Sequence, residues 1–103
     1  MTFDEYQKIA HETAIYTHSF YPAASLMVES AELADLFLKP QLRGDDKPIN
    51  INKVISEAGD VLWNLSELLY QNELSLQDVA DYNVKKLESR ADRGVLKGDG
   101  GER

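Results

Sequence analysis

Two pairs of acidic residues have a spacing that suits a shared metal ion. Glu29 and Glu32 stand three positions apart, and so do Glu57 and Asp60. In a helix this spacing puts both side chains on one face, so two helices packed together would point four carboxylates into one volume. Clustered negative charges need a counter-charge where they are partly buried, and Mg²⁺ favours carboxylate oxygens together with water and phosphate groups. The pattern predicts a magnesium site, with Mn²⁺ as a substitute ion.

The alternative interpretation is that these acidic pairs lie on solvated helix faces, which is common in a chain with 18 acidic residues. The neighbouring residues argue against it, because both pairs have apolar neighbours in the sequence, so that neither lies on a wholly polar face. Small residues also stand between the acidic ones and would let two helices approach closely: Ser30, Ala31, Ala58 and Gly59.

A second group of residues could bind phosphate. Asn83, Lys86 and Arg90 follow one another at helical intervals of three and four residues. Arginine pairs with phosphate oxygens through two parallel hydrogen bonds, and lysine neutralises them as a point charge. The alternative is that basic residues near a helix end complement the helix dipole. Further basic residues follow towards the C-terminus: Arg93, Lys97 and Arg103.

Four helices are predicted to carry these residues, which makes the fold all-α. The spacing of Thr2 and Glu5 fits a capping box, and the first helix is expected to run to about His18. Pro22 suits the first turn of a second helix, and Pro40 should close it or kink its last turn. The polar segment 43–50 is expected to be an exposed connection.

The apolar pattern predicts a third helix from about 52 to 71, which we expect to be the central helix of the core. Ser75 and Asp78 have cap-like spacing and begin a fourth helix that should run to about Ala91. Because the connection is short, the third and fourth helices are expected to form an antiparallel hairpin. Glycine is frequent from about residue 93, which predicts an irregular tail ordered by a ligand or a neighbouring subunit.

Length and composition limit the remaining possibilities. A chain of 103 residues with 43% hydrophobic and 28% charged residues is expected to form a single domain over residues 1–103. A net charge of -7 argues against binding to nucleic acid or to anionic lipid. Without cysteine there is neither a disulfide nor a thiolate site, and a reducing, cytoplasmic location is expected. No apolar run is long enough to span a membrane.

The two acidic pairs resemble the signature of the MazG-like, all-α nucleoside triphosphate pyrophosphohydrolases, in which E-x-x-E is followed after a spacer by E-x-x-D. Here these motifs read Glu29-Ser-Ala-Glu32 and Glu57-Ala-Gly-Asp60. The similarity covers about four-fifths of the chain. It includes the strings Tyr21-Pro-Ala, Gly59-Asp-Val-Leu-Trp63, Leu76-Gln-Asp-Val-Ala80 and Asn83-Val-Lys-Lys-Leu87, then Arg90 and Arg93-Gly94.

This resemblance implies a four-helix bundle completed by a dimer or a pair of dimers. It also implies Mg²⁺-dependent hydrolysis of the α–β bond of a nucleoside triphosphate, yielding monophosphate and pyrophosphate, in some relatives as house-cleaning of the nucleotide pool. The acidic residues at 29, 32, 57 and 60 would bind the metal, and Glu29 would also orient the attacking water. Asn83, Lys86 and Arg90 would bind the phosphates. Two positions depart from the family pattern, since Val28 stands where many members have glutamate and Ala31 where many have glycine.

Aromatic and amide residues near the acidic pairs could recognise the base. Trp63 and Asn64 lie about one helical turn beyond Asp60, and His18, Phe20 and Tyr21 precede the second helix. An aromatic ring could stack on a base, and an amide or imidazole could read its edge. The alternative is that these side chains belong to the core.

Two other classes of protein remain to be considered. A di-iron bundle would need Glu-x-x-His pairs on facing helices, whereas neither His11 nor His18 follows a glutamate by three residues. A non-enzymatic helical interaction module, kept soluble by its acidic residues, is the stronger rival.

Overall fold

The computed structural model describes residues 1–94, which form four α-helices. These are α1 (Phe3–Glu12), α2 (Tyr21–Arg43), α3 (Ile51–Gln71) and α4 (Leu76–Asp92). This part of the chain contains no strand, so the all-α prediction is confirmed. The predicted glycine-rich tail, with Lys97 and Arg103, lies outside the described residues. Within residues 1–94, no helix is both long enough and apolar enough to cross a membrane.

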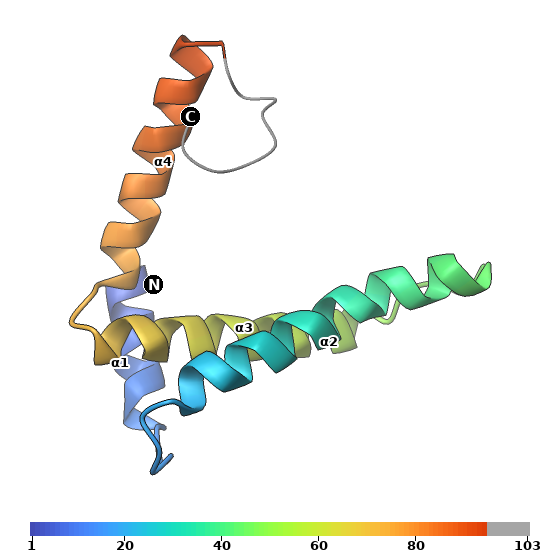
Figure 1. The fold of residues 1–103 in the computed structure, drawn as a ribbon, viewed down its shortest axis with the longest axis horizontal. Helices are drawn as coiled ribbons and strands as arrows, with labels where there is room; N and C mark the ends of the chain where they lie inside the picture. Colours follow the sequence, from blue (N-terminus) through green and yellow to red (C-terminus); the bar gives the residue numbers. More distant parts are fainter. Residues whose placement is uncertain (95–103) are drawn as a thin grey trace.

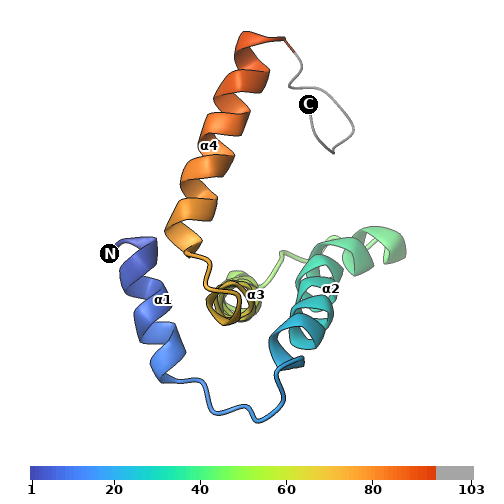
Figure 2. The same cartoon turned by 60° about the vertical axis from the view of Figure 1, so that its left-hand side comes forward.

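Helix α3 is the central element of the fold. It contacts each of the other three helices, and α2 lies beside it over much of its length (Figure 1). Figure 2 looks nearly along α3 and shows α1 and α2 on opposite sides of it. The prediction of a central third helix is therefore confirmed, and α2 and α3 are the two helices that carry the acidic pairs.

The predicted helix starts are formed by side-chain caps. Thr2 and Glu5 make both hydrogen bonds of the capping box, 3.1 Å from the Glu5 amide nitrogen to the Thr2 hydroxyl and 2.9 Å in the reverse direction. The Ser75 hydroxyl accepts a hydrogen bond of 3.1 Å from the Asp78 amide at the start of α4. Pro22 stands in the first turn of α2, as predicted.

Two helices end at residues other than those predicted. Helix α1 stops at Glu12 instead of about His18, because the Thr13 hydroxyl donates to the Ala10 carbonyl at 2.7 Å and the next residues bond to α3 instead of continuing the helix. Of the two roles predicted for Pro40, closing α2 is wrong, because the helix runs on to Arg43; Pro40 lies in its last turn, and a kink there stays a prediction. The helix ends at Gly44, whose φ of 69° is a left-handed conformation that glycine adopts at little cost.

The expected antiparallel hairpin of α3 and α4 is wrong. Helix α4 rises steeply away from α3 in both views (Figures 1 and 2). Its first turn is held by α1: the Gln7 side chain accepts from the Leu76 amide at 3.1 Å and donates to the carbonyls of Ser66 and Leu74 at 3.2 and 3.1 Å. This one buried amide joins α1, α3 and the start of α4. Two further hydrogen bonds hold the start of α4 against α1, from the Phe3 amide to Gln77 at 3.1 Å and from the Ser75 hydroxyl to Asp4 at 2.9 Å.

For Gly59, the expectation that a small residue allows close helix approach is wrong. A side-chain carbon placed on Gly59 would meet no atom within 4 Å, so this glycine is not required for the contact between α2 and α3. Its backbone is helical, and its small size has no packing explanation within the described part of the single chain.

The single chain is open rather than compact. Its radius of gyration is 16.5 Å, whereas a globular chain of this length has about 13 Å. Its accessible surface is 7878 Å², roughly 2,000 Å² more than the mass scaling gives for a folded monomer. Among the described residues, the buried apolar side chains are Ala10, Pro22 and Leu76. A single copy therefore has very little apolar core.

Candidate functional site

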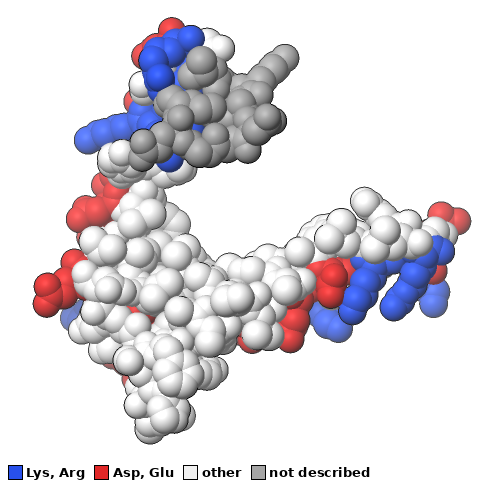
Figure 3. Space-filling view, viewed as in Figure 1, with Lys and Arg blue, Asp and Glu red and all other residues white. Residues whose placement is uncertain are grey.

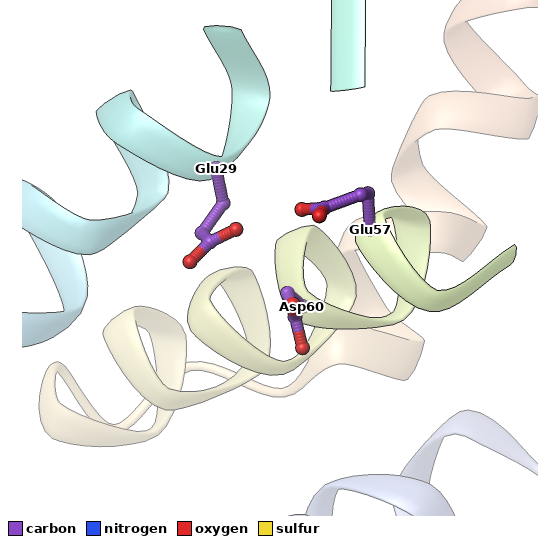
Figure 4. Close-up of side chains that lie close together, drawn as sticks. All are labelled: Glu29, Glu57 and Asp60. Carbon is purple, nitrogen blue, oxygen red and sulfur yellow. The ribbon is translucent and has the colours of Figure 1, made fainter. Parts of the chain in front are cut away.

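Three of the four predicted metal ligands converge where α2 packs against α3. Glu29 comes from α2, and Glu57 and Asp60 come from successive turns of α3 (Figure 4). One carboxylate oxygen of each lies within 4.8 Å of the others. Two oxygens on opposite sides of one Mg²⁺ are about 4 Å apart, so a shared ion would need only a slight contraction of this group. We call these three residues the carboxylate cluster.

Glu57 provides the observation that best fits a cation. Its Oε2 atom is buried and has no hydrogen-bond partner, although Glu57 stands beside another carboxyl group. No lysine, arginine or histidine within residues 1–94 forms an ion pair with the carboxylate cluster. A buried carboxylate oxygen without donor or counter-charge is costly, and a hard divalent cation supplies what is missing. The residues of the cluster therefore fit Mg²⁺.

The pKa of Glu29 reflects its burial and the negative charge around it. Burial, the charge of Glu32, a hydrogen bond to Glu57 and the charges of Asp60 and Glu57 together raise the pKa of Glu29 to about 7. Without a cation, the cluster therefore relieves its repulsion by holding a proton near neutral pH.

Glu32 stands apart from this group of three. It lies three residues beyond Glu29 on α2 and is exposed, yet its charge is close enough to raise the pKa of Glu29. The structure brings Glu32 near the cluster without including it, so its role as a ligand stays a prediction.

The predicted phosphate ligands lie on a different element. Asn83, Lys86 and Arg90 are carried by α4, which contacts α1 and α3 but not α2. The Arg90 side chain is buried, and Asn83 is exposed. Within one chain the structure does not bring these residues together with the carboxylate cluster.

Three of the four predicted base-binding residues line one pocket. Its volume is about 360 Å³, and its walls come from the connection between α1 and α2, from Tyr21 and from Trp63; they comprise Thr13, Ile15, Tyr16, Thr17, His18, Tyr21 and Trp63. We call it the aromatic pocket. Asn64, the fourth, is buried instead, and its Nδ2 donates to the Asp60 carbonyl at 2.8 Å. Phe20 stacks on His18 outside the residues that line the pocket, with ring centroids 5.1 Å apart.

Sequence reasoning missed the polar residues that support this pocket. Glu67 is fully buried on α3 and accepts hydrogen bonds from Tyr16 and His11. The sequence contains one indication of this role, because Glu67 interrupts the apolar stripe of α3. It follows Asp60 by seven residues, which places the two acidic side chains on the same face of the helix.

Comparison with known proteins finds a matching family and a similar protein. The profile of the MazG nucleotide pyrophosphohydrolase domain matches residues 21–95, which include the carboxylate cluster, Trp63 and α4. The Gene 37 protein of Mycobacterium phage L5 is 36% identical over 115 residues, and the match covers 100% of both chains. No solved structure shows a significant match.

Proposed function

Since the chain belongs to the MazG nucleotide pyrophosphohydrolase family, we propose that it hydrolyses nucleoside triphosphates in a reaction that depends on Mg²⁺. Water adds across the α–β phosphoanhydride bond, and the products are a nucleoside monophosphate and pyrophosphate. The observation that carries this proposal is the meeting of Glu29, Glu57 and Asp60, with a buried Glu57 oxygen that has no partner.

The carboxylates are proposed to hold the ion and to orient the water. Glu29, Glu57 and Asp60 would bind Mg²⁺, and Glu32 would join them from the next turn of α2. Magnesium supplies charge neutralisation for the phosphate oxygens and lowers the pKa of a nearby water. Glu29, which reaches the cluster from α2, is the proposed residue that orients the water and accepts its proton. The reaction needs no covalent nucleophile.

Phosphate binding is assigned to α4 in the assembled protein. Asn83, Lys86 and Arg90 have suitable chemistry, but α4 does not contact α2 within one chain. We therefore propose that α4 of one copy approaches the carboxylate cluster of another copy.

A homo-oligomer, a dimer or tetramer, is part of the same proposal. The excess surface of roughly 2,000 Å² per chain is the size that permanent interfaces bury. Figure 3 shows a face that is largely uncharged, with acidic and basic residues gathered at its outline: along the edge of the α2–α3 pair, on α4 and by the α3–α4 connection. Large apolar side chains are exposed on all four helices; they include Ile9 on α1, Met27, Phe37 and Leu38 on α2, Ile51 and Ile55 on α3, and Tyr82, Val84 and Leu87 on α4.

The base is proposed to bind in the aromatic pocket. His18, Tyr21 and Trp63 line it, and flat rings of this kind stack on a nucleobase. Asn64 is proposed to contribute indirectly, because it is buried on the turn of α3 that joins Asp60 to the pocket.

The biological setting that we propose is house-cleaning of the nucleotide pool in the cytoplasm. A cytoplasmic location fits a chain that contains no cysteine. Preference for a noncanonical nucleotide would support this setting, and preference for an ordinary triphosphate would contradict it.

A panel of canonical and modified nucleoside triphosphates, incubated with and without Mg²⁺, tests the reaction. The products must be identified, because pyrophosphate with monophosphate indicates cleavage of the α–β bond, whereas orthophosphate with diphosphate indicates a different hydrolase. Mn²⁺ should replace Mg²⁺. Absence of turnover across the panel, together with no metal-induced change in Tm, would favour the helical interaction module instead.

A further inference from the structure

Glu67 is a fully buried glutamate, with an exposed fraction of 0%. Its carboxylate lies 3.1 and 3.3 Å from Nδ1 of His11 and accepts a hydrogen bond of 2.9 Å from the Tyr16 hydroxyl. A buried ionic group is often no more stabilising than an apolar residue of similar volume, so its presence suggests a task other than stability. Both partners come from the N-terminal segment, whereas Glu67 comes from the central helix.

Tyr16 lies in a segment that has no regular secondary structure. Residues 14–18 follow the end of α1, and four of them supply more than half of the residues that line the aromatic pocket. Besides Glu67, Gln71 of α3 holds this segment: its Nε2 donates to the Tyr16 hydroxyl at 3.1 Å and to the Ser19 carbonyl at 2.9 Å. The placement of the pocket wall therefore depends on side-chain hydrogen bonds from α3.

The ring of Tyr16 is the central ring of the pocket. It stacks on Tyr21 with centroids 5.6 Å apart and an interplanar angle of 17°, and it meets Trp63 edge to face at 6.3 Å. The Trp63 indole is itself fixed, since its Nε1 donates to the Thr13 hydroxyl at 2.9 Å. A change in the position of Tyr16 would alter the shape of the pocket at both neighbours.

The pocket lies within reach of the carboxylate cluster. Trp63 follows Asp60 by three residues on α3, and Tyr21 precedes Glu29 by eight residues on α2, about 12 Å along a helix axis. A ligand with a flat ring at one end and phosphates at the other could occupy both places.

We propose that Glu67 is a positioning residue for the nucleobase: its hydrogen bond to Tyr16 holds the aromatic wall of the pocket in place and thereby sets base preference. This inference rests on the proposed function, because it assumes that the ligand of the pocket is the base of the substrate. Glu67 touches no substrate atom and acts only through Tyr16.

The experiment compares Glu67→Leu, Glu67→Gln, Tyr16→Phe and the double variant Glu67→Leu/Tyr16→Phe. Leucine and phenylalanine each remove the hydrogen bond, whereas glutamine keeps an oxygen that can accept from Tyr16. Glu73→Gln is the matched control, because Glu73 is exposed in the connection between α3 and α4 and does not line the aromatic pocket.

Two readouts separate base binding from catalysis. Trp63 is the only tryptophan of the chain, so its fluorescence reports on the pocket directly when nucleosides without phosphate are added. The second readout is kcat/KM for each triphosphate of the panel, with KM and kcat determined separately.

We expect Tyr16→Phe and Glu67→Leu to weaken binding of the preferred nucleoside about tenfold and to raise KM with little change in kcat. Glu67→Gln and Glu73→Gln should stay within about threefold of wild type. The double variant should lose clearly less than the sum of the two single losses, because both changes break the Glu67–Tyr16 bond, although Tyr16→Phe also removes the bond from Gln71 and Glu67→Leu the contact with His11. If Glu67→Leu does not fold, Tyr16→Phe tests the same bond with the ring retained.

Unchanged nucleoside affinity and base preference in a folded Tyr16→Phe variant would overturn the inference. So would the absence of any nucleoside effect on Trp63 fluorescence in the wild type. The proposed function fails separately: nucleoside binding with no hydrolysis of any triphosphate would refute the reaction and leave the pocket standing.

Discussion

At the scale of single residues, the carboxylate cluster gathers negative charge before any ion is bound. Glu57 leaves a buried oxygen unpaired, and Glu29 has a pKa of about 7. Burial first, and then the neighbouring negative charges, disfavour the charged form of Glu29 in the metal-free chain. If these carboxylates lower the stability of the metal-free protein in order to bind an ion, replacing one of them should increase the stability of the metal-free protein and abolish turnover.

Substitution of Glu57 by glutamine tests this directly. The change removes one negative ligand with almost no change of shape, so turnover should be abolished while the metal-free Tm stays equal or increases. The stabilising effect of Mg²⁺ on Tm should decrease in the same variant. Asp35→Asn is the control, because Asp35 lies on α2 outside the carboxylate cluster and pairs with Lys39 at 3.3 Å. A Glu57→Gln variant that unfolds would show that Glu57 has a structural role.

The titration of Glu29 predicts how the stability of the metal-free chain depends on pH. The pKa in the folded chain is about 7, above the ordinary value of 4.5, so the folded chain binds the proton more tightly than the unfolded chain. The contribution of Glu29 to the free energy of unfolding should therefore increase as pH falls from about 7 towards 4.5 and should be lost above pH 7.

Urea unfolding in the presence of a metal chelator, at pH values from about 5 to about 8, measures this dependence. Comparison with Glu29→Gln isolates the contribution of Glu29, because the other titrating groups stay the same. The free energy of unfolding of the wild type, minus that of the variant, should increase as the pH is lowered. A difference that is independent of pH would contradict the raised pKa.

At the scale of helices, Gln7 is the residue on which the arrangement most depends. Its amide makes three hydrogen bonds, to Ser66, Leu74 and Leu76, and thereby joins α1, α3 and α4. Gln7→Leu would keep the volume but leave a buried amide and two carbonyls without this partner. We expect a loss of about 2 to 4 kcal/mol in the free energy of unfolding. Lys8→Ala, at an exposed neighbouring position, should change it by less than about 0.5 kcal/mol.

Gly59 gives a prediction of opposite sign. It lies inside α3 with helical backbone, and a side-chain carbon there would meet nothing within 4 Å. Gly59→Ala should therefore stabilise the helix by about 1 kcal/mol, measured by urea unfolding. A loss of stability would mean that a second chain packs closely against this position.

The sequence predicted the helices because local signals specify them. The Thr2 capping box, the Ser75 cap and the apolar stripe of α3 act within a few residues of each other. The paired acidic residues were also readable, since a spacing of three places them on one face. The end of α1 and the direction of α4 were not predictable, because they depend on hydrogen bonds from Gln7 and Tyr16 to residues more than 50 positions away. For the same reason, the support of the aromatic pocket was missed.

At the scale of the whole molecule, an open chain with little apolar core must gain stability elsewhere. The radius of gyration of 16.5 Å and the exposed apolar side chains of α2, α3 and α4 are the grounds on which we propose that further copies cover this surface. Folding and assembly would then be coupled, so the Tm of the protein should increase with its concentration.

Sedimentation analysis and melting curves over a range of concentrations test this coupling. The wild type, with a chain mass of 11.6 kDa, should sediment at twice that mass or more. Tyr82, with an exposed fraction of 71%, is an apolar residue of α4 that we expect to be covered, so Tyr82→Glu should dissociate or unfold the assembly. Lys85→Gln changes the charge of the same helix equally without placing a charge on an apolar surface, and it should assemble normally.

Because α4 carries the proposed phosphate ligands, a dissociated Tyr82→Glu variant should also lose turnover while Mg²⁺ binding at the carboxylate cluster persists. A stable monomer with full activity would refute both the assembly and the assignment of α4 to a neighbouring active site.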